Sequence, residues 1–406
     1  MIPPSLEDSP KCPRCSLVGI CLPDETRLCH DLEGAGLVSP ESPDRSTDGR
    51  RPSSEPRRLV AARDDLRPLY LNAQGLHVGK SSNVLKVKEK DKVVQEVRIA
   101  ETCQLSLFGN IQLTTQVLQT LRENEVPVAY FSQGGWFYGI TQGLGVRNIA
   151  LRREQFRLAE NPEFCLDVAR TLVAGKIRNQ RTMLQRNHVE PSSTHIALLK
   201  SLAEDAEKAD SLPQLRGIEG NAARAYFGLF AGMIKVGDGD PATDSKPSEF
   251  AFDFNHRNRR PPKDPVNALL SLAYSVLAKY LTIVCSAVGF DPFLGFYHQP
   301  RFGRASLPLD LMEPFRPLIA DSAVLSAINT RMITPRDFVR AGQSVALKPE
   351  GRKAFFRAYE QRMDALVTRP LFGYRLNYRR MLEIQTRLLA RVVTYEMTTY
   401  PVFTTR

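Results

Sequence analysis

The segment FDPFLGFYHQPRFGRASLPLDLMEPFR, residues 290–316, places one histidine and two carboxylates within a short distance along the chain. His298 comes first, and Asp310 and Glu313 follow, three residues apart. Two prolines bracket these acids and favour a short helical turn, in which positions i and i+3 share a face. An imidazole with carboxylate oxygens suits Mn²⁺ or Mg²⁺ better than a metal that prefers thiolates. The alternative is an ordinary surface histidine near an ordinary acidic pair.

The composition predicts a folded, basic protein that binds a polyanion. The 406 residues suffice for two or three domains, and 42% of them are hydrophobic, which allows sizeable cores. The formal net charge of +11 favours nucleic acid over a membrane surface as the partner, although a merely soluble basic protein has the same balance. The most apolar run, residues 266–288, contains Asn267 and Lys279, which predicts a buried helix and no membrane span.

A cysteine pattern marks the first residues of the chain, which form a separate tail over residues 1–32. Cys12, Cys15 and Cys21 have the spacing C-x2-C-x5-C, typical of zinc or iron–sulfur ligation. Such sites usually need four protein ligands, so Cys29 or His30 would supply the fourth, or a domain outside this chain would. A remnant that binds no metal is the other interpretation.

Composition then divides the rest of the chain into three regions. Residues 33–67 are rich in Ser, Pro, Asp and Arg, as expected for a flexible linker. Residues 68–145 alternate apolar and polar positions, which predicts strands, with one helix near residues 114–123. Residues 146–406 have helical patterns. We therefore predict an α+β protein in which an N-terminal β-rich domain precedes a larger all-α catalytic domain.

Two groups of basic residues are candidates for phosphate contacts. The first lies on a helix that should begin at Asn161, where an N-cap residue precedes a proline. The second lies on a proline-stiffened loop. Lysines and arginines on one face would neutralise DNA phosphates, although a solvated helix face has the same pattern. The candidates are Arg178 and Arg181 on the helix and Arg259, Arg260 and Lys263 on the loop.

One acid stands in the middle of an apolar helix predicted over residues 212–234. This acid is Glu219, and its neighbours are mostly glycine and alanine. A buried carboxylate is strongly destabilising unless it is paired or bound to a cation. Arg216 and Arg224 are possible partners, and a metal ion is the alternative.

Three segments, in this order and spacing, resemble the CRISPR adaptation integrase family, the universal spacer-acquisition endonucleases. The segments are RGIEGNAARAYF (216–227), RRPPKDPVNALLSLAYSVL (259–277) and GFYHQPRFGRASLPLDLMEPFRP (295–317). The resemblance extends over about residues 68–406 and implies a β domain followed by an α domain. It also implies a divalent-metal site at Glu219, His298 and Glu313, with Asp310 as a second acid beside the metal.

The cysteine tail has a resemblance of its own. CPRCSLVGICLPDE (12–25) is similar to the C-terminal end of the CRISPR-associated RecB-like iron–sulfur exonucleases. Cys12, Cys15 and Cys21 match the last three of that family's four cysteines. The family's remaining cysteine, which lies far upstream of these three, and its nuclease motifs have no counterpart here. A 4Fe–4S cluster is therefore expected only together with that exonuclease domain.

These resemblances imply a reaction and a set of partners. A 3′-hydroxyl of incoming DNA would attack a phosphodiester at a CRISPR repeat, with Mg²⁺ or Mn²⁺ as the metal. The expected partners are double-stranded DNA, a second copy of the chain, a small ferredoxin-like adaptation protein and the exonuclease domain. The expected location is the prokaryotic cytoplasm, without membrane attachment. The alternatives are a structure-specific nuclease that does not integrate, and a non-catalytic DNA-binding protein built on the cysteines.

Overall fold

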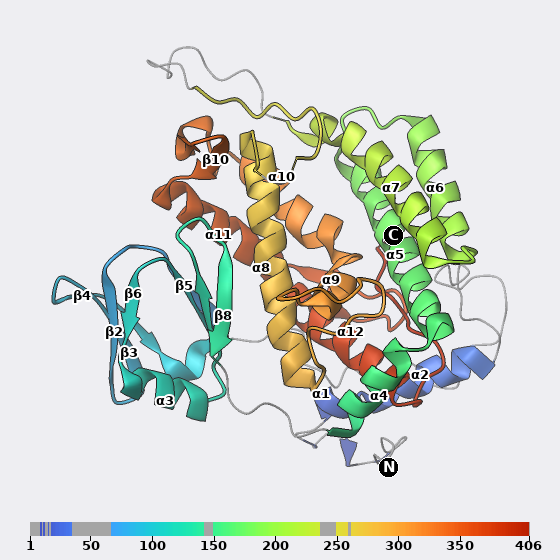
Figure 1. The fold of residues 1–406 in the computed structure, drawn as a ribbon, viewed down its shortest axis with the longest axis horizontal. Helices are drawn as coiled ribbons and strands as arrows, with labels where there is room; N and C mark the ends of the chain where they lie inside the picture. Colours follow the sequence, from blue (N-terminus) through green and yellow to red (C-terminus); the bar gives the residue numbers. More distant parts are fainter. Residues whose placement is uncertain are drawn as a thin grey trace.

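The structure is a computed structural model, which describes residues 9, 11–12, 15, 18–34, 66–141, 149–235, 249–258 and 261–405. Most of the predicted linker, residues 35–65, lies outside this description. A strand-rich domain lies on one side of the molecule and a helical domain on the other, with the long helix α8 (Pro265–Val288) between them (Figure 1). This order of domains agrees with the α+β prediction.

The strand-rich domain contains two four-stranded sheets within the described residues. One has the order β1-β5-β7-β8, with β8 antiparallel to β7 and the other neighbours parallel. The second has the order β4-β3-β2-β6. The elements are β1 (Arg67–Leu71), β2 (Leu76–Ser81), β3 (Val84–Glu89), β4 (Lys92–Arg98), the short 3₁₀ turn η2 (Ile99–Glu101), β5 (Thr102–Phe108), β6 (Ile111–Leu113), α3 (Thr115–Glu123), β7 (Val128–Phe131) and β8 (Phe137–Thr141).

Alternation along β1 explains how this domain joins the helical domain. Leu69 and Leu71 are buried in the core of the strand-rich domain, together with residues of both sheets and α3. Because successive strand residues point to opposite faces, Tyr70 points the other way. Its ring stacks on Phe356 at 4.4 Å between centroids, and its hydroxyl donates to Glu360 Oε1 at 2.8 Å. The two domains therefore share a packed, hydrogen-bonded interface.

The helical domain has a continuous hydrophobic core. Its described residues also form two short antiparallel hairpins, so the prediction of an all-α domain holds only in outline. Its elements are α4 (Ile149–Ala159), α5 (Pro162–Asn187), α6 (Ser193–Glu207), α7 (Leu212–Gly228), the 3₁₀ turn η3 (Phe230–Met233), α8, α9 (Ser306–Met312), the π-helical turn η4 (Arg316–Asp321), α10 (Ser322–Asn329), the 3₁₀ turn η5 (Pro335–Asp337), β9 (Phe338–Ala341), β10 (Ser344–Leu347), α11 (Pro349–Asp364), β11 (Leu366–Thr368), β12 (Arg375–Asn377) and α12 (Tyr378–Val393).

Local sequence fixes where the long helices begin and end. Asn161 Oδ1 accepts from the amide of Glu163 at 3.0 Å, and Pro162 is the first residue of α5. Asp264 caps α8 in the same way. Gly289 ends α8 with a φ of 110°, a conformation that glycine adopts without a Cβ clash. These caps confirm the start predicted for α5.

Helix α8 is long and apolar enough to cross a membrane by length and composition alone. Of its most apolar window, however, 56% is buried inside the protein. Asn267 on this helix is fully buried, and its Oδ1 accepts from Arg257 Nη1 at 2.6 Å and from the amide of Asn258 at 3.1 Å. The helix therefore serves as a core helix that also anchors the preceding basic loop.

The N-terminal tail packs on the helical domain. It forms α1 (Val18–Cys21) and α2 (Pro23–Gly34), which lie beside α4 and the C-terminal segment (Figure 1). Leu28 is 3% exposed in the main core. Tyr374 donates its hydroxyl hydrogen to Glu25 Oε1 at 2.5 Å, and Glu33 Oε1 accepts from the amide of Thr399 at 2.9 Å. The tail is thus attached to the domain by apolar and polar contacts.

Candidate active site

The predicted metal ligands meet at one pocket of about 280 Å³. The pocket is formed where α5, α7 and α8 face the histidine loop and the turn after α9. Its lining residues are Lys176, Gln180, Arg216, Glu219, Gly220, Ala223, Phe227, Tyr274, His298, Glu313, Arg316 and Asp321. Glu219, His298 and Glu313, which are far apart in the sequence, therefore face the same cavity.

Asp310 orients His298 from beneath the pocket. Its carboxylate is fully buried and accepts from the His298 amide at 2.8 Å and from the amides of Phe296 and Tyr297 at 2.6 and 3.0 Å. His298 Nδ1 lies 2.7 Å from Asp310 Oδ1. This contact leaves Nε2 as the ring nitrogen that faces Glu313, 3.7 Å from Glu313 Oε1. Asp310 thus supports the imidazole, and its own oxygens are occupied by hydrogen bonds.

A glycine makes this support possible. A Cβ atom at position 295 would lie 2.6 Å from Asp310 Oδ2 and 2.9 Å from the backbone carbon of Ser306. Only a residue without a side chain lets the histidine loop approach the buried carboxylate this closely. Gly295 therefore belongs to the architecture of the site, although it has no functional group.

Glu219 on α7 is held by a cation and a hydroxyl. Lys176 Nζ lies 2.5 Å from Glu219 Oε1, and Tyr297 donates its hydroxyl hydrogen to Glu219 Oε2 at 2.5 Å. Burial alone would raise the pKa of Glu219, but the Lys176 ammonium and the Tyr297 hydrogen bond outweigh burial and lower it to about 2. Glu219 is therefore ionised at neutral pH. Its cationic partner is Lys176 of α5; the predicted pairing with Arg216 or Arg224 is not the one formed.

Glu313 lies at the end of α9 and is only 1% exposed. Lys176 Nζ lies 2.7 Å from its Oε2, and Arg316 Nη2 lies 2.9 Å from its Oε1. Each of the two pocket carboxylates, Glu219 and Glu313, therefore contacts the same lysine.

The donor set fits a hard divalent cation, although it is not gathered around one point. Within the described residues, no three His, Cys, Asp or Glu side chains form a ready-made ligand group. Two carboxylates and one free imidazole nitrogen are nevertheless the ligand types that Mg²⁺ and Mn²⁺ accept. The buried Glu313 Oε2 faces the Lys176 ammonium at 2.7 Å, so a metal bound to this oxygen would share it with Lys176 or displace the lysine.

Sequence reasoning missed a buried carboxylate on the pocket wall. Asp321 Oδ2 accepts from the Tyr226 hydroxyl at 2.9 Å, and Asp321 Oδ1 accepts from the Tyr274 hydroxyl at 2.6 Å. Burial raises the pKa of Asp321 to about 6, against the opposing effect of the two tyrosine hydrogen bonds. Tyr226 belongs to the first motif segment and Tyr274 to the second, so the motif segments already contained the two tyrosines that contact Asp321.

The basic candidates have different positions. Arg178 is buried, with Nη2 2.8 Å from Glu207 Oε1 of α6, so this side chain joins two helices, and its contact with DNA stays a prediction. Arg181 is half-buried and Lys263 is exposed. Arg259 and Arg260 lie outside the described residues. The loop before α8 thus retains one described, exposed cation.

The cysteines of the tail do not form a ligand cluster in the part of the chain that the structure describes. Cys12 is buried, Cys15 is exposed, and Cys21 is intermediate. Cys29 is buried, and burial raises the pKa of its thiol to about 12, which disfavours the thiolate that a metal needs. Cys29 is therefore a poor fourth ligand in this arrangement.

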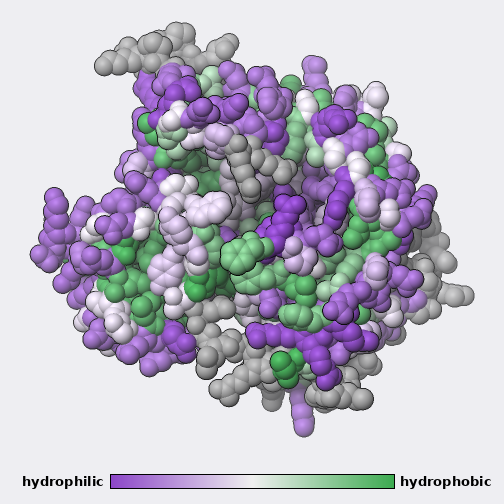
Figure 2. Space-filling model, in the orientation of Figure 1, coloured by the Kyte–Doolittle hydropathy of each residue, from purple (hydrophilic) through white to green (hydrophobic). Residues whose placement is uncertain are grey.

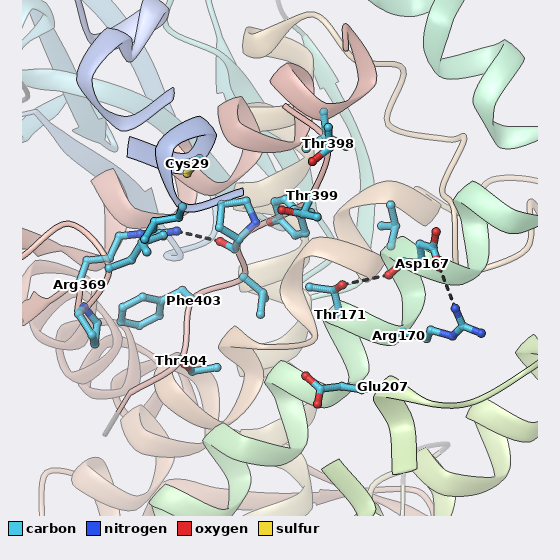
Figure 3. A pocket seen from close by; sticks show the side chains of 18 of the residues that line it. Cys29, Asp167, Arg170, Thr171, Glu207, Arg369, Thr398, Thr399, Phe403 and Thr404 are labelled. Atoms are coloured by element: carbon cyan, nitrogen blue, oxygen red, sulfur yellow. Dashed lines mark hydrogen bonds and ion pairs between the residues drawn. The ribbon is translucent and has the colours of Figure 1, made fainter. Parts of the chain in front are cut away.

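A larger cavity, about 400 Å³, lies between α2, α5 and the C-terminal segment (Figure 3). It shares no lining residue with the pocket that holds Glu219 and His298. Arg369 Nη2 donates to the Pro401 carbonyl at 2.8 Å, and Arg170 Nη1 pairs with Asp167 at 2.8 Å, as the dashed lines show (Figure 3). Its charged groups are thus engaged within the protein, and the chemistry-bearing residues lie in the smaller pocket.

The surface near the pocket is mixed in character. Figure 2 shows hydrophobic residues across the middle of this face, over α8 and its neighbours, with hydrophilic residues around the perimeter. Phe302 and Phe293 on the histidine loop are among the exposed hydrophobic residues. The loop that carries His298 therefore exposes two apolar side chains, while Arg216 and Arg316 line the pocket.

Comparison with known proteins agrees with the geometry. The family model "CRISPR associated protein Cas1" matches residues 69–361. A CRISPR-associated exonuclease Cas4/endonuclease Cas1 fusion from Geobacter sulfurreducens is 46% identical over 411 residues, covering 100% of this chain and 68% of the fusion. A CRISPR-associated endonuclease Cas1 from Thermus thermophilus is 36% identical, covering 83% of this chain and 97% of that protein.

The fold of this chain is also similar to that of a solved Cas1 structure. A CAS1 protein from Thermotoga maritima has a TM-score of 0.66 at 24% identity, covering 82% of this chain and 99% of that structure. The chain spans about two thirds of the length of the fusion relatives that it matches, 64% to 68%. The family match and the near-complete coverage of single Cas1 proteins show that this chain belongs to the Cas1 family of CRISPR-associated endonucleases.

Proposed function

We propose that this chain, a Cas1 endonuclease and integrase of CRISPR adaptation, joins a 3′-hydroxyl of a short DNA fragment to a phosphodiester of a CRISPR repeat. The new bond from the 3′-oxygen to phosphorus would replace the repeat strand's own 3′-oxygen–phosphorus bond, and the cut repeat strand would leave with a 3′-hydroxyl. Glu219, Glu313 and Nε2 of His298 would bind Mg²⁺ or Mn²⁺ for this reaction. The supporting observation is that these three groups face one pocket while Asp310 holds the other imidazole nitrogen. A support of this kind is usual behind metal-ligating histidines.

The residues of the pocket have distinct tasks in this proposal. A bound divalent cation would polarise the phosphate and lower the pKa of the attacking hydroxyl. Asp310 fixes the tautomer and direction of His298, and Tyr297 holds Glu219 by its hydroxyl hydrogen. The Arg316 guanidinium, beside Glu313, supplies positive charge toward a phosphate in the pocket.

The partners follow from the same proposal. Double-stranded DNA supplies both the incoming fragment and the repeat, and most contacts should be made to the phosphate backbone. A homodimer, a small ferredoxin-like partner and a RecB-like exonuclease domain would complete the assembly, in the prokaryotic cytoplasm. Cys12, Cys15 and Cys21 would hold a 4Fe–4S cluster only together with that exonuclease domain.

A strand-transfer assay tests the proposal. Labelled duplex DNA is mixed with a repeat-bearing plasmid, Mn²⁺, this chain and its small partner, and covalent joining is measured. We expect joining by the wild type and a loss of at least 100-fold in His298→Ala and Glu219→Gln, because the metal ligands would be removed. His77→Ala, which removes an exposed histidine from β2, should join DNA normally.

The other functions give different results in the same assay. Nicking without joined product would favour a structure-specific nuclease. DNA binding without nicked or joined product, unchanged in Glu219→Gln and lost in Cys12→Ala, would favour a non-catalytic, cysteine-based DNA-binding protein and overturn the proposal.

A further inference from the structure

A buried lysine lies between the two carboxylates that we assign to the metal. Lys176 is 7% exposed, and its Nζ contacts Glu219 Oε1 at 2.5 Å and Glu313 Oε2 at 2.7 Å. Its neighbours on α5, Ala174, Gly175 and Ile177, are all buried as well. The Lys176 side chain lines the pocket, and these carboxylates are its charged partners there.

Local charge is already balanced in this arrangement. Glu219 and Glu313 carry two negative charges, and Lys176 and Arg316 carry two positive charges within contact distance. A divalent cation added alone would leave this group with an excess of two positive charges in a site of low dielectric constant. A DNA phosphodiester that enters with the cation would offset part of the excess and would give the ammonium a new partner.

We propose that Lys176 is a resident cation that competes with the divalent metal for Glu219 and Glu313, so that metal binds tightly only together with a DNA phosphate. Lys176 is then a positioning residue that couples metal binding to DNA binding. Such coupling is reciprocal, so the metal strengthens DNA binding by the same factor. This proposal rests on the proposed metal site, and it adds that the site binds its metal tightly only when a DNA phosphate is also bound.

Mn²⁺ binding measured by electron paramagnetic resonance tests this without any activity readout. For the wild-type chain, a short duplex with 3′-hydroxyl ends should tighten Mn²⁺ binding by about tenfold or more. Lys176→Met keeps the length of the side chain and removes its charge. It should bind Mn²⁺ about tenfold more tightly than the wild type without DNA, and the effect of DNA should shrink. Lys200→Met, which removes an exposed charge from α6, is the matched control and should behave as the wild type does.

The outcomes separate the two proposals. If Glu219→Gln and His298→Ala leave Mn²⁺ binding unchanged, the metal site itself is wrong. If they abolish binding but Lys176→Met gains no affinity, only the role of Lys176 is overturned. Should Lys176→Met not fold, because its two carboxylates then repel each other, the wild-type measurement decides: Mn²⁺ binding that is equally tight with and without DNA contradicts the proposal.

A separate observation concerns the loop that carries His298. Phe302 is fully exposed, at 109% of its reference area. It lies on a tight turn in which the backbones of Arg301 and Arg304 form an antiparallel β-bridge and Gly303 has a φ of 69°. The Arg304 guanidinium donates to the carbonyl of Gln299, which stiffens the turn. An apolar ring is thus presented to solvent four residues from His298, with an arginine on either side of Phe302 and Gly303.

We infer that the Phe302 ring stacks on an unpaired base of the DNA strand whose phosphate enters the pocket. Aromatic rings beside basic residues bind single-stranded nucleic acid in this way, because every base has a stacking face. The alternative occupant of this ring is a second copy of the chain. The base is favoured because the turn directly follows His298, which lines the pocket and whose amide and ring are held by the buried Asp310.

DNA that carries 2-aminopurine near its 3′ end tests the stacking. The wild type should quench the probe's fluorescence, Phe302→Ala should lose the quenching and bind the end about tenfold more weakly, and Phe302→Trp should retain both. Phe293→Ala, which removes another exposed ring of the same loop, is the control. Unchanged quenching in Phe302→Ala, or a loss of the dimer in that variant, would overturn the inference.

Discussion

At the scale of single residues, the site depends on buried polar groups whose partners are supplied by backbone as much as by side chains. Asp310 accepts hydrogen bonds from three consecutive amides and faces His298 Nδ1. One carboxylate therefore fixes both the backbone of the loop and the orientation of the imidazole ring. Its neighbour Gly295 leaves the space for this arrangement. The reactive nitrogen is therefore positioned by residues that do not themselves touch the pocket.

Asp310→Asn should weaken metal binding and strand transfer together, each by roughly 10- to 100-fold, as expected for the group behind a metal-ligating histidine. The amide replaces one acceptor oxygen by a donor that opposes the backbone N–H groups. Mn²⁺ titration and the strand-transfer assay measure the two effects. Retention of the folded state is checked by thermal unfolding, and a variant that folds and still binds Mn²⁺ like the wild type would contradict this role.

Asp321 should make stability depend on pH. Its pKa is about 6 in the folded protein and 3.8 in its ordinary state, so between these values the folded chain keeps a proton that the unfolded chain has lost. Its contribution to stability is therefore present below about pH 4 and is lost as pH rises to about 6. Asp321→Asn removes this dependence, so relative to the wild type its free energy of unfolding should rise by about 3 kcal/mol between pH 4 and pH 7.

Urea unfolding of the two proteins at several pH values measures that difference. A difference that stays constant from pH 4 to pH 7 would show that Asp321 does not hold the proton. Tyr274→Phe serves as a control, because it removes one hydroxyl that stabilises the charged form and should move the transition to higher pH.

At the scale of elements, helix ends follow local sequence, whereas helix faces depend on the neighbours. The Asn161–Pro162 start of α5 was predictable because capping involves only adjacent residues. The burial of the α5 face that carries Lys176 and Arg178 could not be predicted from local sequence, because α6, α7 and the turn after α9 cover that face. Arg178 was interpreted as part of a basic surface, and both Lys176 and Arg178 form internal ion pairs.

The tail helix α2 offers a direct test of its packing. Leu28→Ala should lower the free energy of unfolding by about 2–5 kcal/mol, because the side chain is buried in the main core and its removal leaves a cavity. Ile20→Ala in the adjacent α1, where the side chain is 47% exposed, should change it by less than about 0.5 kcal/mol. Chemical denaturation measures both, and equal small effects would mean that the tail is not docked.

At the scale of the whole molecule, sequence predicted the order of domains and the three residues that face the pocket. Strand alternation and helix periodicity indicate domains, and the three spaced motifs identified Glu219, His298 and Glu313. Their surroundings were less accessible, because Lys176, Tyr297 and Asp321 gain their partners only when distant segments meet. The aliphatic residues just before Lys176, Leu172 to Ala174, were the available signal, since a lysine buried among aliphatic residues requires an acidic partner.

The central claim is that one divalent cation is held by Glu219, His298 and Glu313 at this pocket. Crystals of the chain with a short DNA duplex and Mn²⁺, measured at a wavelength where manganese scatters anomalously, test it most directly. We expect an anomalous peak within bonding distance of both carboxylates and of His298 Nε2, with Lys176 turned away from at least one of them. A peak that instead contacts Asp310, or the absence of any peak at the pocket, would contradict it.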